Sequence, residues 1–429
     1  MKKNIAIFPA ASEIGLEINR ALKYSTRLNV YGFSSMRDHT EYVYENYILD
    51  LPFIKDKNFI EELNKRIIEF KIDFIYPAND DVQLFLTENQ KKIKARIITS
   101  QEETVEICRS KIKTYNYLKK ENFIPKIFKD YSEIHEYPIF IKPDIGQGSK
   151  GAKIIKDEKE LRNILENTTE KMVISEYLPG EEYTIDCFTD FKGQLRVTKM
   201  RNRKRIRLGI SVNSEILKLD EEVLRIANII NNYFDFNGAW FFQLKIDSSG
   251  KYKLMEIAPR ISGTMGISRN TGINYPLLTI FNQMKQEVEI IENNYEIEVD
   301  RAFINRYKLN LEYENVYLDL DDTLILKEKV NTFLIMFLYQ CINKKKKIYL
   351  LTRHSKEVEK TLKKHKICEE IFEEIIHLKE EDKLKSNYIK ENSIFIDDSF
   401  RERYDVMNKK NIPVFDVSEV ESLIDWRKI

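Results

Sequence analysis

The sequence predicts a multidomain protein of mixed α/β and α+β class. The chain has 429 residues, which corresponds to two to four domains at about 150 residues per domain. Short apolar strands alternate with helical segments through most of its length. Apolar residues make up 42% and charged residues 32%, a composition that supports buried cores and excludes a disordered chain.

The first hundred residues are predicted to form a small open parallel sheet covered by helices. The expected strands are 4–8, 29–33, 74–76 and 96–99, and the expected helices are 14–22 and 59–70. Asn79, Asp80 and Asp81 follow the third strand, at the sheet edge where such folds bind ligands. A plain turn that caps a helix is the alternative. The lone Gly15 is no dinucleotide fingerprint.

The net charge indicates which partners to expect, and the cysteine content indicates the redox compartment. Lys plus Arg total 70 and Asp plus Glu total 69, a net charge of +1, so neither a nucleic acid nor a membrane surface is an expected partner. The four cysteines form no CxxC pair and predict reduced thiols in a cytoplasmic protein. Pro9 interrupts the apolar amino terminus, which favours a strand over a signal peptide. The apolar run 332–342 is about half as long as a helix that spans a bilayer.

A glycine-rich loop is the first chemical signal, in the segment YPIFIKPDIGQGSKGAKII. Phe140 and Lys142 share one face of the strand that precedes the loop. Three glycines within 146–151 let backbone N–H groups approach an anion, and Lys142 and Lys150 add positive charge. We interpret this segment as a phosphate-binding loop. A flexible hairpin is the alternative, because the spacing is not that of a Walker motif.

Two downstream segments have the composition of a nucleotide and metal site. In VISEYLPGEEYTIDCF the chain turns after Leu178, where backbone groups can contact an adenine edge, and Glu182 can accept hydrogen bonds from a ribose. WFFQLKIDSSGKYKLMEIAPRISG is predicted to form a hairpin of strands 240–246 and 252–257. Oxygen ligands on neighbouring strands are those that magnesium prefers, and Glu256 ends the second strand.

Over about residues 1–295 these motifs resemble the ATP-grasp superfamily, in its carbamoyl-phosphate-synthase-like branch. The resemblance implies a Rossmann-like pre-ATP-grasp domain at 1–108 and an ATP-grasp domain of two subdomains at 109–295. The residues that it assigns to ATP are Lys111, Lys142, Gly146, Gly148, Ser149, Gly151, Glu176, Tyr177, Leu178 and Glu182.

The same resemblance implies a metal site. Gln243 and Glu256 would bind magnesium or manganese, and Arg260 would stabilise the transferred phosphoryl group. Ala258 stands where the family commonly has an Asn that completes the metal site. The number and geometry of the metals therefore stay open.

Positive residues recur at every second position of TKMRNRKRIRLGIS, from Lys199 to Arg207. On a strand they would share one face, where like charges repel unless anions meet them. We expect this face to bind a triphosphate, an acyl phosphate or an acidic substrate, mainly through Arg201, Arg203 and Arg207. A solvated basic turn or an RNA-contacting stripe is the alternative.

After a predicted linker at 296–313, a further α/β domain is expected at 314–429. In VYLDLDDTLI an apolar strand ends in acidic residues, and two later strands, 348–351 and 394–396, end in Thr352 and in Asp397. Buried strands rarely end in carboxylates without a cation or a catalytic task, because unpaired buried charge is costly.

These residues resemble the haloacid-dehalogenase-like (HAD) superfamily. The resemblance implies that Asp319 is the nucleophile, that Asp321 is the general acid and base, and that Thr352 binds the phosphoryl oxygens. The residues implied to surround the magnesium ion are Asp319, Asp321, Asp397 and Asp398. The phosphate-neutralising lysine is predicted to be Lys385 rather than Lys383. Only 33 positions separate Asp319 from Thr352, which predicts a capless, open site that His354 lines.

The two resemblances together predict a bifunctional cytoplasmic enzyme. ATP with Mg²⁺ or Mn²⁺ would convert a small-molecule carboxylate to an acyl phosphate that an amine attacks, and the last domain would hydrolyse a phosphorylated metabolite. A small-molecule kinase and a nucleotide-binding regulatory protein are the alternatives. The sequence is compatible with a homodimer, and it identifies neither the substrates nor the order of the two steps.

Overall fold

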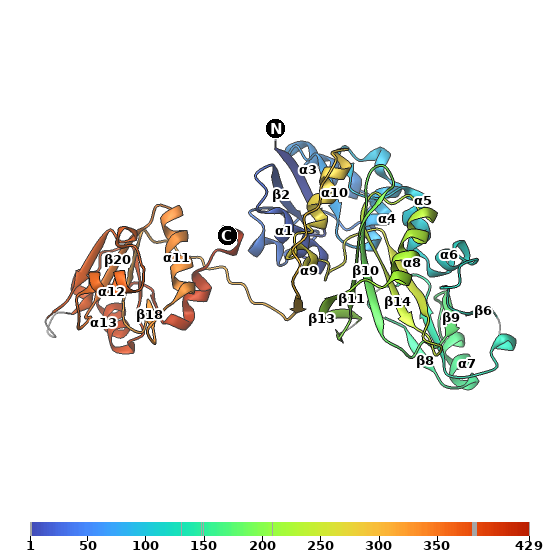
Figure 1. The fold of residues 1–429 in the computed structure, drawn as a ribbon. Helices are drawn as coiled ribbons and strands as arrows, with labels where there is room; N and C mark the ends of the chain where they lie inside the picture. The colour runs from blue at the N-terminus through green and yellow to red at the C-terminus, as the bar shows by residue number, and fades with distance from the viewer. Residues whose placement is uncertain are drawn as a thin grey trace. The chain divides into compact units, whose positions relative to one another are not determined.

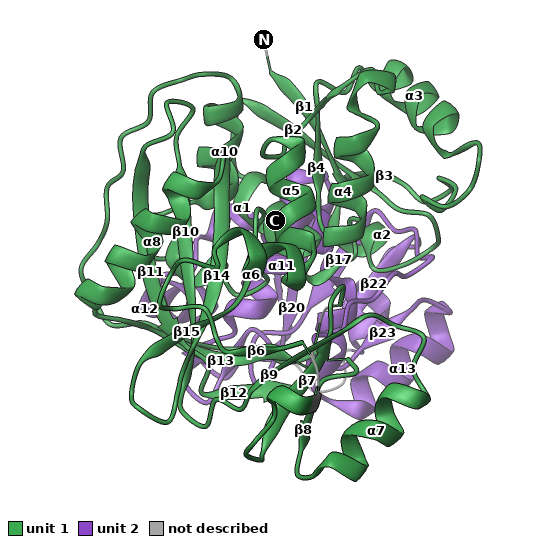
Figure 2. Cartoon of the chain, turned by 90° about the vertical axis from the view of Figure 1, so that its right-hand side faces the viewer, with its two compact units in different colours: residues 1–303 green, residues 304–429 purple. Residues whose placement is uncertain are grey.

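The computed structural model describes residues 2–129, 131–146, 148, 150–207, 209–379 and 384–428. The chain divides into two compact units, residues 1–303 and 304–429 (Figure 2). The boundary falls within the segment 296–313 that we expected to be a linker. The predicted site residue Ser149 and the alternative lysine Lys383 lie outside the described residues. Within those residues, no helix has both the length and the hydropathy needed to cross a membrane.

The first unit begins with a parallel sheet, as predicted, which is drawn in blue in Figure 1. The order of its strands is β3-β2-β1-β4-β5. Its strands are β1 (Lys3–Phe8), β2 (Leu28–Phe33), β3 (Asn46–Ile48), β4 (Phe74–Pro77) and β5 (Arg96–Ile97). Its helices are α1 (Glu13–Leu22), α2 (Thr40–Val43), α3 (Phe59–Glu69) and α4 (Asp80–Glu88). The strand order reverses between β1 and β4, so the loops that follow these two strands open toward the same edge.

A smaller antiparallel sheet positions the glycine-rich loop. Its order is β6-β9-β7-β8. The elements are β6 (Ile127–Phe128), β7 (Ile139–Pro143), β8 (Lys153–Ile155), β9 (Met172–Glu176) and the covering helix α7 (Glu158–Glu166). Ile139, Ile141 and Leu161 form its small core. The glycine-rich loop connects β7 to β8, so both of its ends are anchored in the sheet.

The largest sheet of the unit has the order β12-β13-β11-β10-β14-β15, with β16 paired to β13. Its strands are β10 (Glu182–Thr189), β11 (Leu195–Asn202), β12 (Arg205–Arg207), β13 (Ile210–Leu217), β14 (Gly238–Ile246), β15 (Tyr252–Ala258) and β16 (Glu298–Asp300). The accompanying helices are α5 (Glu102–Arg109), α6 (Lys111–Tyr117), α8 (Glu221–Tyr233), α9 (Gly266–Arg269) and α10 (Tyr275–Gln283). The hairpin β14–β15 is as predicted. The strand β16 lies within the expected linker, which is therefore partly structured.

The alternating positive residues do not lie on one continuous strand, and that prediction is wrong. β11 ends at Asn202, the chain bends, and β12 begins at Arg205. Asn202 stabilises this break, because its amide oxygen accepts a hydrogen bond from the backbone N–H of Glu215 at 2.9 Å. Arg201 is consequently buried while Arg205 is exposed.

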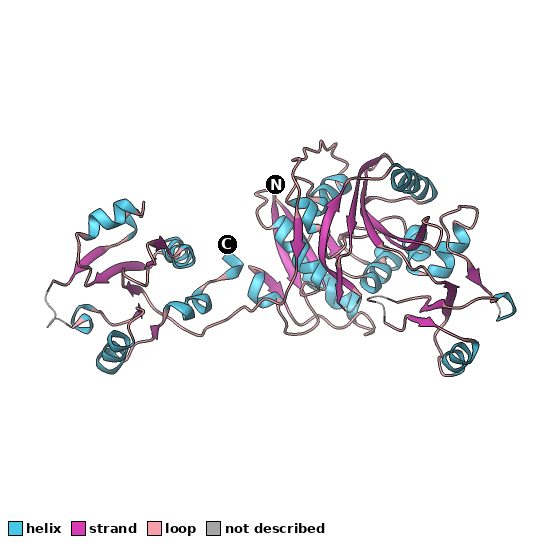
Figure 3. Cartoon of the chain, turned by 60° about the horizontal axis from the view of Figure 1, so that its bottom comes forward, coloured by secondary structure: helices cyan, strands magenta, loops and turns pink. Residues whose placement is uncertain are grey.

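The second unit is a parallel sheet in the order β21-β20-β17-β22-β23 with helices on both faces (Figure 3). Its strands are β17 (Asn315–Leu318), β20 (Lys347–Thr352), β21 (Glu374–His377), β22 (Ser393–Ile396) and β23 (Val414–Phe415). Its helices are α11 (Thr332–Asn343), α12 (Val358–Lys364) and α13 (Phe400–Lys410). A short hairpin of β18 (Ile325–Leu326) and β19 (Lys329–Val330) follows β17. The carboxyl ends of β17, β20 and β22 are neighbours, so the three predicted motifs meet at one edge.

Candidate active sites

The first unit contains a cleft of about 380 Å³ between its amino-terminal sheet and its largest sheet. The predicted site residues that line it are Lys111, Gly146, Gly148, Arg201, Arg203, Gln243, Glu256 and Arg260. Ser12, Glu13, Asn79 and Asp80 line it from the amino-terminal sheet. Residues as far apart in the sequence as Ser12 and Arg260, 248 positions, therefore line one cleft.

Gln243 and Glu256 lie directly opposite each other on the antiparallel strands β14 and β15. Directly opposed residues of an antiparallel pair share one face of the sheet, and both of these residues line the cleft. Ala258 pairs with Phe241 two residues further along and offers no side-chain oxygen. The hairpin therefore presents two oxygen ligands of the type that magnesium accepts.

A second, smaller pocket adjoins Lys142. Its lining residues include Phe140, Lys142, Glu176, Tyr177, Leu178, Lys245 and Met255. The Lys142 ammonium group donates hydrogen bonds to the Tyr115 hydroxyl at 2.9 Å and to the Met255 carbonyl at 3.1 Å. Burial lowers the pKa of Lys142 to about 8, although the charges of Glu256 and Glu182 partly oppose this effect. The predicted adenine-contacting residues and a predicted phosphate-binding lysine thus border one apolar pocket.

Two predicted nucleotide contacts already have partners within the protein. The Glu176 carboxylate accepts a hydrogen bond from the backbone N–H of Lys126 at 2.7 Å. Glu182 forms an ion pair with Arg203 at 3.1 Å. Glu182 could hold a ribose only through its remaining lone pairs, which a carboxylate has in excess.

The glycine-rich loop packs against the turn that follows the arginines. Gly148 and Gly151 have positive φ angles of 64° and 75°, which glycine adopts without steric cost. A Cβ atom on Gly209 would lie 2.2 Å from the Gly148 carbonyl carbon, so this contact requires glycine. Lys111 lies beneath the loop, with its ammonium group 3.5 Å from the Gly146 carbonyl oxygen. Burial lowers the pKa of Lys111.

Arg201 occupies the floor of the cleft. Its Nε atom donates to Asp186 at 2.8 Å, and one Nη atom donates to Ser262 at 2.8 Å. Only 2% of Arg201 is exposed, yet its other Nη atom has no hydrogen-bond partner. The Nε atoms of Arg203 and Arg109, which also line the cleft, are likewise buried without a partner. Buried donors of this kind indicate a ligand with acceptor atoms.

The structure does not support the prediction that Arg207 binds an anionic ligand together with Arg201 and Arg203. Arg207 is exposed and its guanidinium lies 5.4 Å from the centre of the Phe303 ring. It is absent from the described lining of the cleft. The break between β11 and β12 carries it away from Arg201 and Arg203.

Arg260 connects the two halves of the cleft. It donates two hydrogen bonds of 2.6 Å to the carboxylate of Asp80, and its guanidinium lies over the Phe241 ring at 5.2 Å. Burial raises the pKa of Asp80, but the Arg260 charge outweighs burial and holds that pKa below its usual value. Asn79 caps α4 through the backbone N–H of Val82. The loop after β4 thus forms the capping turn and also positions Arg260.

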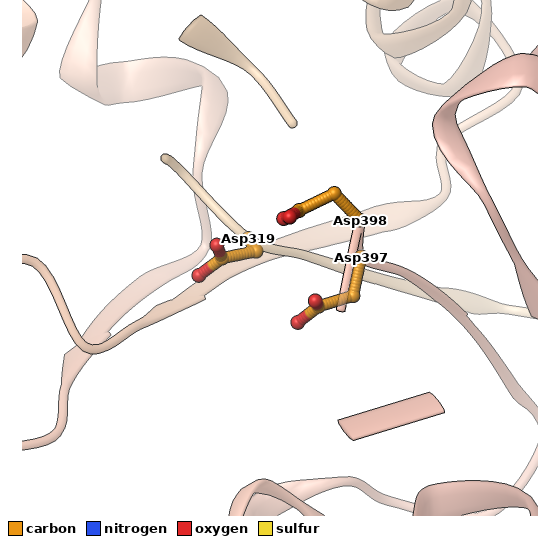
Figure 4. Close-up of side chains that lie close together, drawn as sticks. All are labelled: Asp319, Asp397 and Asp398. Atoms are coloured by element: carbon orange, nitrogen blue, oxygen red, sulfur yellow. The ribbon is translucent and has the colours of Figure 1, made fainter. Parts of the chain in front are cut away.

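In the second unit, Asp319, Asp397 and Asp398 offer carboxylate oxygens that all lie within 4.8 Å of one another (Figure 4). The Lys385 ammonium group donates to Asp319 at 2.8 Å and to Asp397 at 2.6 Å. Thr352 ends the neighbouring strand β20, where its side chain is fully buried. This group is the one set of acids in the described residues that is close enough to share a metal ion.

The pKa values in this cluster are those of buried carboxylates whose negative charge is only partly balanced. Burial raises the pKa of Asp397 to about 6, and Lys385 only partly offsets that effect. Burial also raises the pKa of Asp319. Burial alone would lower the pKa of Lys385, but the two carboxylates outweigh it and raise that pKa. A divalent cation at the carboxylates would relieve the cost of their burial.

The Asp321 carboxylate lies outside this cluster and contacts His354. Its oxygens lie 2.8 and 2.9 Å from His354 Nδ1. The sequence predicts that His354 lines this site, but it identifies no partner for the ring. The contact spans 33 positions, and no local pattern predicts it. The partners of Arg201 and Lys142, which are Asp186 and Tyr115, were missed for the same reason.

A family model and a curated relative match parts of this chain. Residues 168–302 match the family described as "ATP-grasp in the biosynthetic pathway with Ter operon". Phosphoribosylamine–glycine ligase of Clostridium acetobutylicum is 31% identical over 170 residues, which are 33% of this chain and 40% of that enzyme. The chain therefore matches less than half the length of this relative.

Solved structures extend the similarity to the whole unit. N5-carboxyaminoimidazole synthetase from Staphylococcus aureus, complexed with ADP, has a TM-score of 0.56 and 17% identity over 68% of this chain and 81% of that one. The biotin carboxylase–β-γ-ATP complex from Campylobacter jejuni has a TM-score of 0.57 and 17% identity, over 70% and 75%. The first unit of this chain therefore has the ATP-grasp fold.

Proposed function

We propose that the first unit is an ADP-forming ligase that joins a carboxylate to an amine, and that the second unit hydrolyses a phosphomonoester. The observation that carries the first half is the convergence of Lys111, Arg201, Gln243, Glu256 and Arg260 on one cleft. The similarity to a phosphoribosylamine–glycine ligase and to ATP-grasp structures solved with ADP and with β-γ-ATP supports the same reaction class.

The residues of the cleft fit ATP and magnesium. Magnesium bound to Gln243 and Glu256 would neutralise phosphate charge and orient the phosphoryl group for transfer. Lys142 and Lys111 would hold the phosphates, with the adenine in the small pocket beside Tyr177. Arg260, fixed in place by Asp80, would stabilise the charge that develops during transfer.

The buried arginine donors would hold the acceptor. A substrate carboxylate that accepts from Arg201 and Arg203 would satisfy N–H groups that lack protein partners. Its oxygen would attack the terminal phosphorus of ATP and release ADP. The amine would then attack the acyl carbon and release phosphate, so the overall products are an amide, ADP and phosphate.

The proposal for the second unit depends on Lys385, because its ammonium group contacts the carboxylates of both Asp319 and Asp397. Asp319 would attack the phosphorus of a phosphomonoester, while Asp321 gives a proton to the departing alcohol oxygen. Asp321 would then take a proton from the water that hydrolyses the aspartyl phosphate, which returns Asp319 and releases phosphate. Asp397 and Asp398 would hold magnesium, which supplies charge neutralisation at the phosphate.

One untargeted experiment tests both halves. The full chain is incubated with ATP, Mg²⁺ and pooled carboxylates and amines, and ADP, phosphate and new masses are measured. The ligase proposal predicts ADP together with a condensed product that persists in Asp319→Asn and disappears in Glu256→Gln. A product that carries phosphate instead of an added amine would make the first unit a kinase. The phosphatase proposal predicts hydrolysis of p-nitrophenyl phosphate that Asp319→Asn abolishes and Glu256→Gln preserves.

A further inference from the structure

The Asp321 side chain is held by a chain of hydrogen bonds that begins at Thr361 in α12. His354 Nδ1 contacts both carboxylate oxygens of Asp321, at 2.8 and 2.9 Å, and His354 Nε2 lies 2.7 Å from the Thr361 hydroxyl. An ionised Asp321 carboxylate can only accept, so Nδ1 then carries the hydrogen of this contact. When Asp321 is protonated to act as the proton donor, its other oxygen still accepts from Nδ1. In the neutral ring, Nε2 is then the acceptor for the Thr361 hydroxyl.

The backbone of His354 is fixed as well. Its N–H donates to the Thr352 hydroxyl at 3.2 Å, and its carbonyl lies 2.7 Å from His377 Nε2 at the end of β21. The His354 side chain is only 9% exposed, whereas the Asp321 side chain is 53% exposed. An exposed carboxylate has several rotamers of similar energy, and a buried ring fixed at both nitrogens has one.

We propose that His354 is a positioning residue that holds Asp321 as the proton donor of the second site, and that this site is built for phosphate esters of alcohols. The inference rests on the phosphatase function proposed above. A misplaced general acid gives little catalysis, because proton transfer requires hydrogen-bond distance to the departing oxygen. The Thr361–His354–Asp321 chain provides that placement.

The substrate class follows from the leaving group. An alkoxide is a poor leaving group and needs a proton as the P–O bond breaks, whereas a carboxylate leaves an acyl phosphate as a stable anion. A positioned acid therefore benefits an ester substrate and adds little for an acyl phosphate. The second unit would then act on a stable phosphate ester and not on the acyl phosphate of the ligase.

Two probes that differ in their leaving group test this inference. Phenyl phosphate has the more basic leaving group, and p-nitrophenyl phosphate needs less protonation. In His354→Ala we expect kcat/KM for phenyl phosphate to fall at least about tenfold, and kcat/KM for p-nitrophenyl phosphate to fall less than about threefold. The ratio is measured as kcat/KM because this quantity covers the steps up to release of the alcohol. Equal losses on the two probes would overturn the positioning role.

Matched variants separate positioning from folding. His354→Asn keeps an N–H donor near the place of Nδ1 and should restore much of the activity on phenyl phosphate. His354→Gln places its donor near Nε2 and should not. In the Asp321→Asn background, His354→Ala should cause no further loss, and an additional loss would contradict action through Asp321. Failure of His354→Asn to exceed His354→Ala would also contradict it.

Two results distinguish this inference from the proposed function. A wild-type chain without Asp319-dependent hydrolysis of either probe would refute the phosphatase proposal and this inference with it. An active wild type with equal losses in His354→Ala would refute the inference alone. If the variants do not fold, ¹⁵N NMR of selectively labelled wild-type histidine gives the answer. Hydrogen on Nδ1 of neutral His354 supports the arrangement, and hydrogen on Nε2 overturns it.

Discussion

Gln243 and Glu256 face each other across β14 and β15, and both side chains line the cleft of the first unit. Because Ala258 contributes no side-chain oxygen, Gln243 and Glu256 are the two residues that would bind a metal ion at this end of the hairpin in the proposed ligase. The loss of either one cannot be compensated from the next position of β15.

Replacement of Glu256 by Gln should reduce ADP formation at least about a hundredfold, because a carboxylate that neutralises metal charge is lost. Far-UV circular dichroism should stay unchanged, since the substitution conserves shape. The matched variant Lys253→Gln lies on the same strand and should retain activity. Full activity in Glu256→Gln would rule out this residue as a metal ligand. Phosphatase activity serves as the internal control.

The hairpin, the glycine-rich loop and the acidic strand ends were predictable because each is a local pattern. The alternation of side chains alone predicts a strand at 240–246, and Asp319 and Asp397 follow apolar runs. The arginine strand failed because the break after Asn202 depends on a hydrogen bond from Glu215, which is 13 positions away. No pattern of spacing shows which distant residue satisfies a polar side chain.

The partners of charged residues were unpredictable for the same reason. The Arg201–Asp186 and Arg260–Asp80 contacts join residues that are 15 and 180 positions apart. The motifs predicted which residues would do the chemistry, but the contacts that orient these residues depend on how the sheets pack. The loop at Asn79 is an example. Asn79 caps α4, and the same loop also lines the cleft, so the capping turn and the site are not exclusive alternatives.

Lys142 should make ATP use depend on pH above neutrality. Its pKa of about 8 means that the charged form is lost as pH rises through 8. We expect kcat/KM for ATP to fall up to about tenfold per pH unit above that value, because phosphate binding needs the charge. Lys142→Arg, which stays charged, should give a flat profile over the same range. A flat profile in the wild type would contradict the prediction.

The lowered pKa of Lys142 affects the stability of the fold in the opposite direction from activity. Above pH 8 the folded protein binds fewer protons at Lys142 than the unfolded chain, so this group makes the free energy of unfolding rise with pH. Activity should therefore fall above pH 8, while the deprotonation of Lys142 should not lower the melting temperature. Parallel thermal unfolding separates the two effects.

Asp80 should stabilise the first unit much more than Glu222, which belongs to an exposed ion pair on α8. The Asp80 side chain is 14% exposed and pairs with Arg260, which is 13% exposed. Asp80→Ala leaves that guanidinium buried without its partner and should lower the free energy of unfolding by about 3–5 kcal/mol. Glu222→Ala breaks a pair with Arg225 in which the two side chains are 47% and 44% exposed, and it should cost less than about 1 kcal/mol. Urea denaturation of the two variants tests this difference, and similar losses would contradict it.

Magnesium should stabilise the second unit above pH 6 and lose that effect below it. The pKa of Asp397 is about 6 in the absence of metal, above the value of about 4 in an unfolded chain. From about pH 4 to about pH 6 this group therefore makes the metal-free protein less stable as the pH rises. Bound magnesium reverses that cost, because it favours the ionised carboxylate. At lower pH the proton competes with the metal.

Thermal unfolding with excess Mg²⁺ and with EDTA, at about pH 5 and about pH 7.5, measures this competition. The difference in melting temperature should be large at the higher pH and small at the lower one. Asp397→Asn should show little difference at either pH, because the neutral amide carries no charge for the metal to offset. An equal magnesium effect at both pH values in the wild type would mean that Asp397 is not a ligand. The Glu256→Gln variant should behave as the wild type in the second unit's transition, which assigns the effect to the carboxyl-terminal cluster.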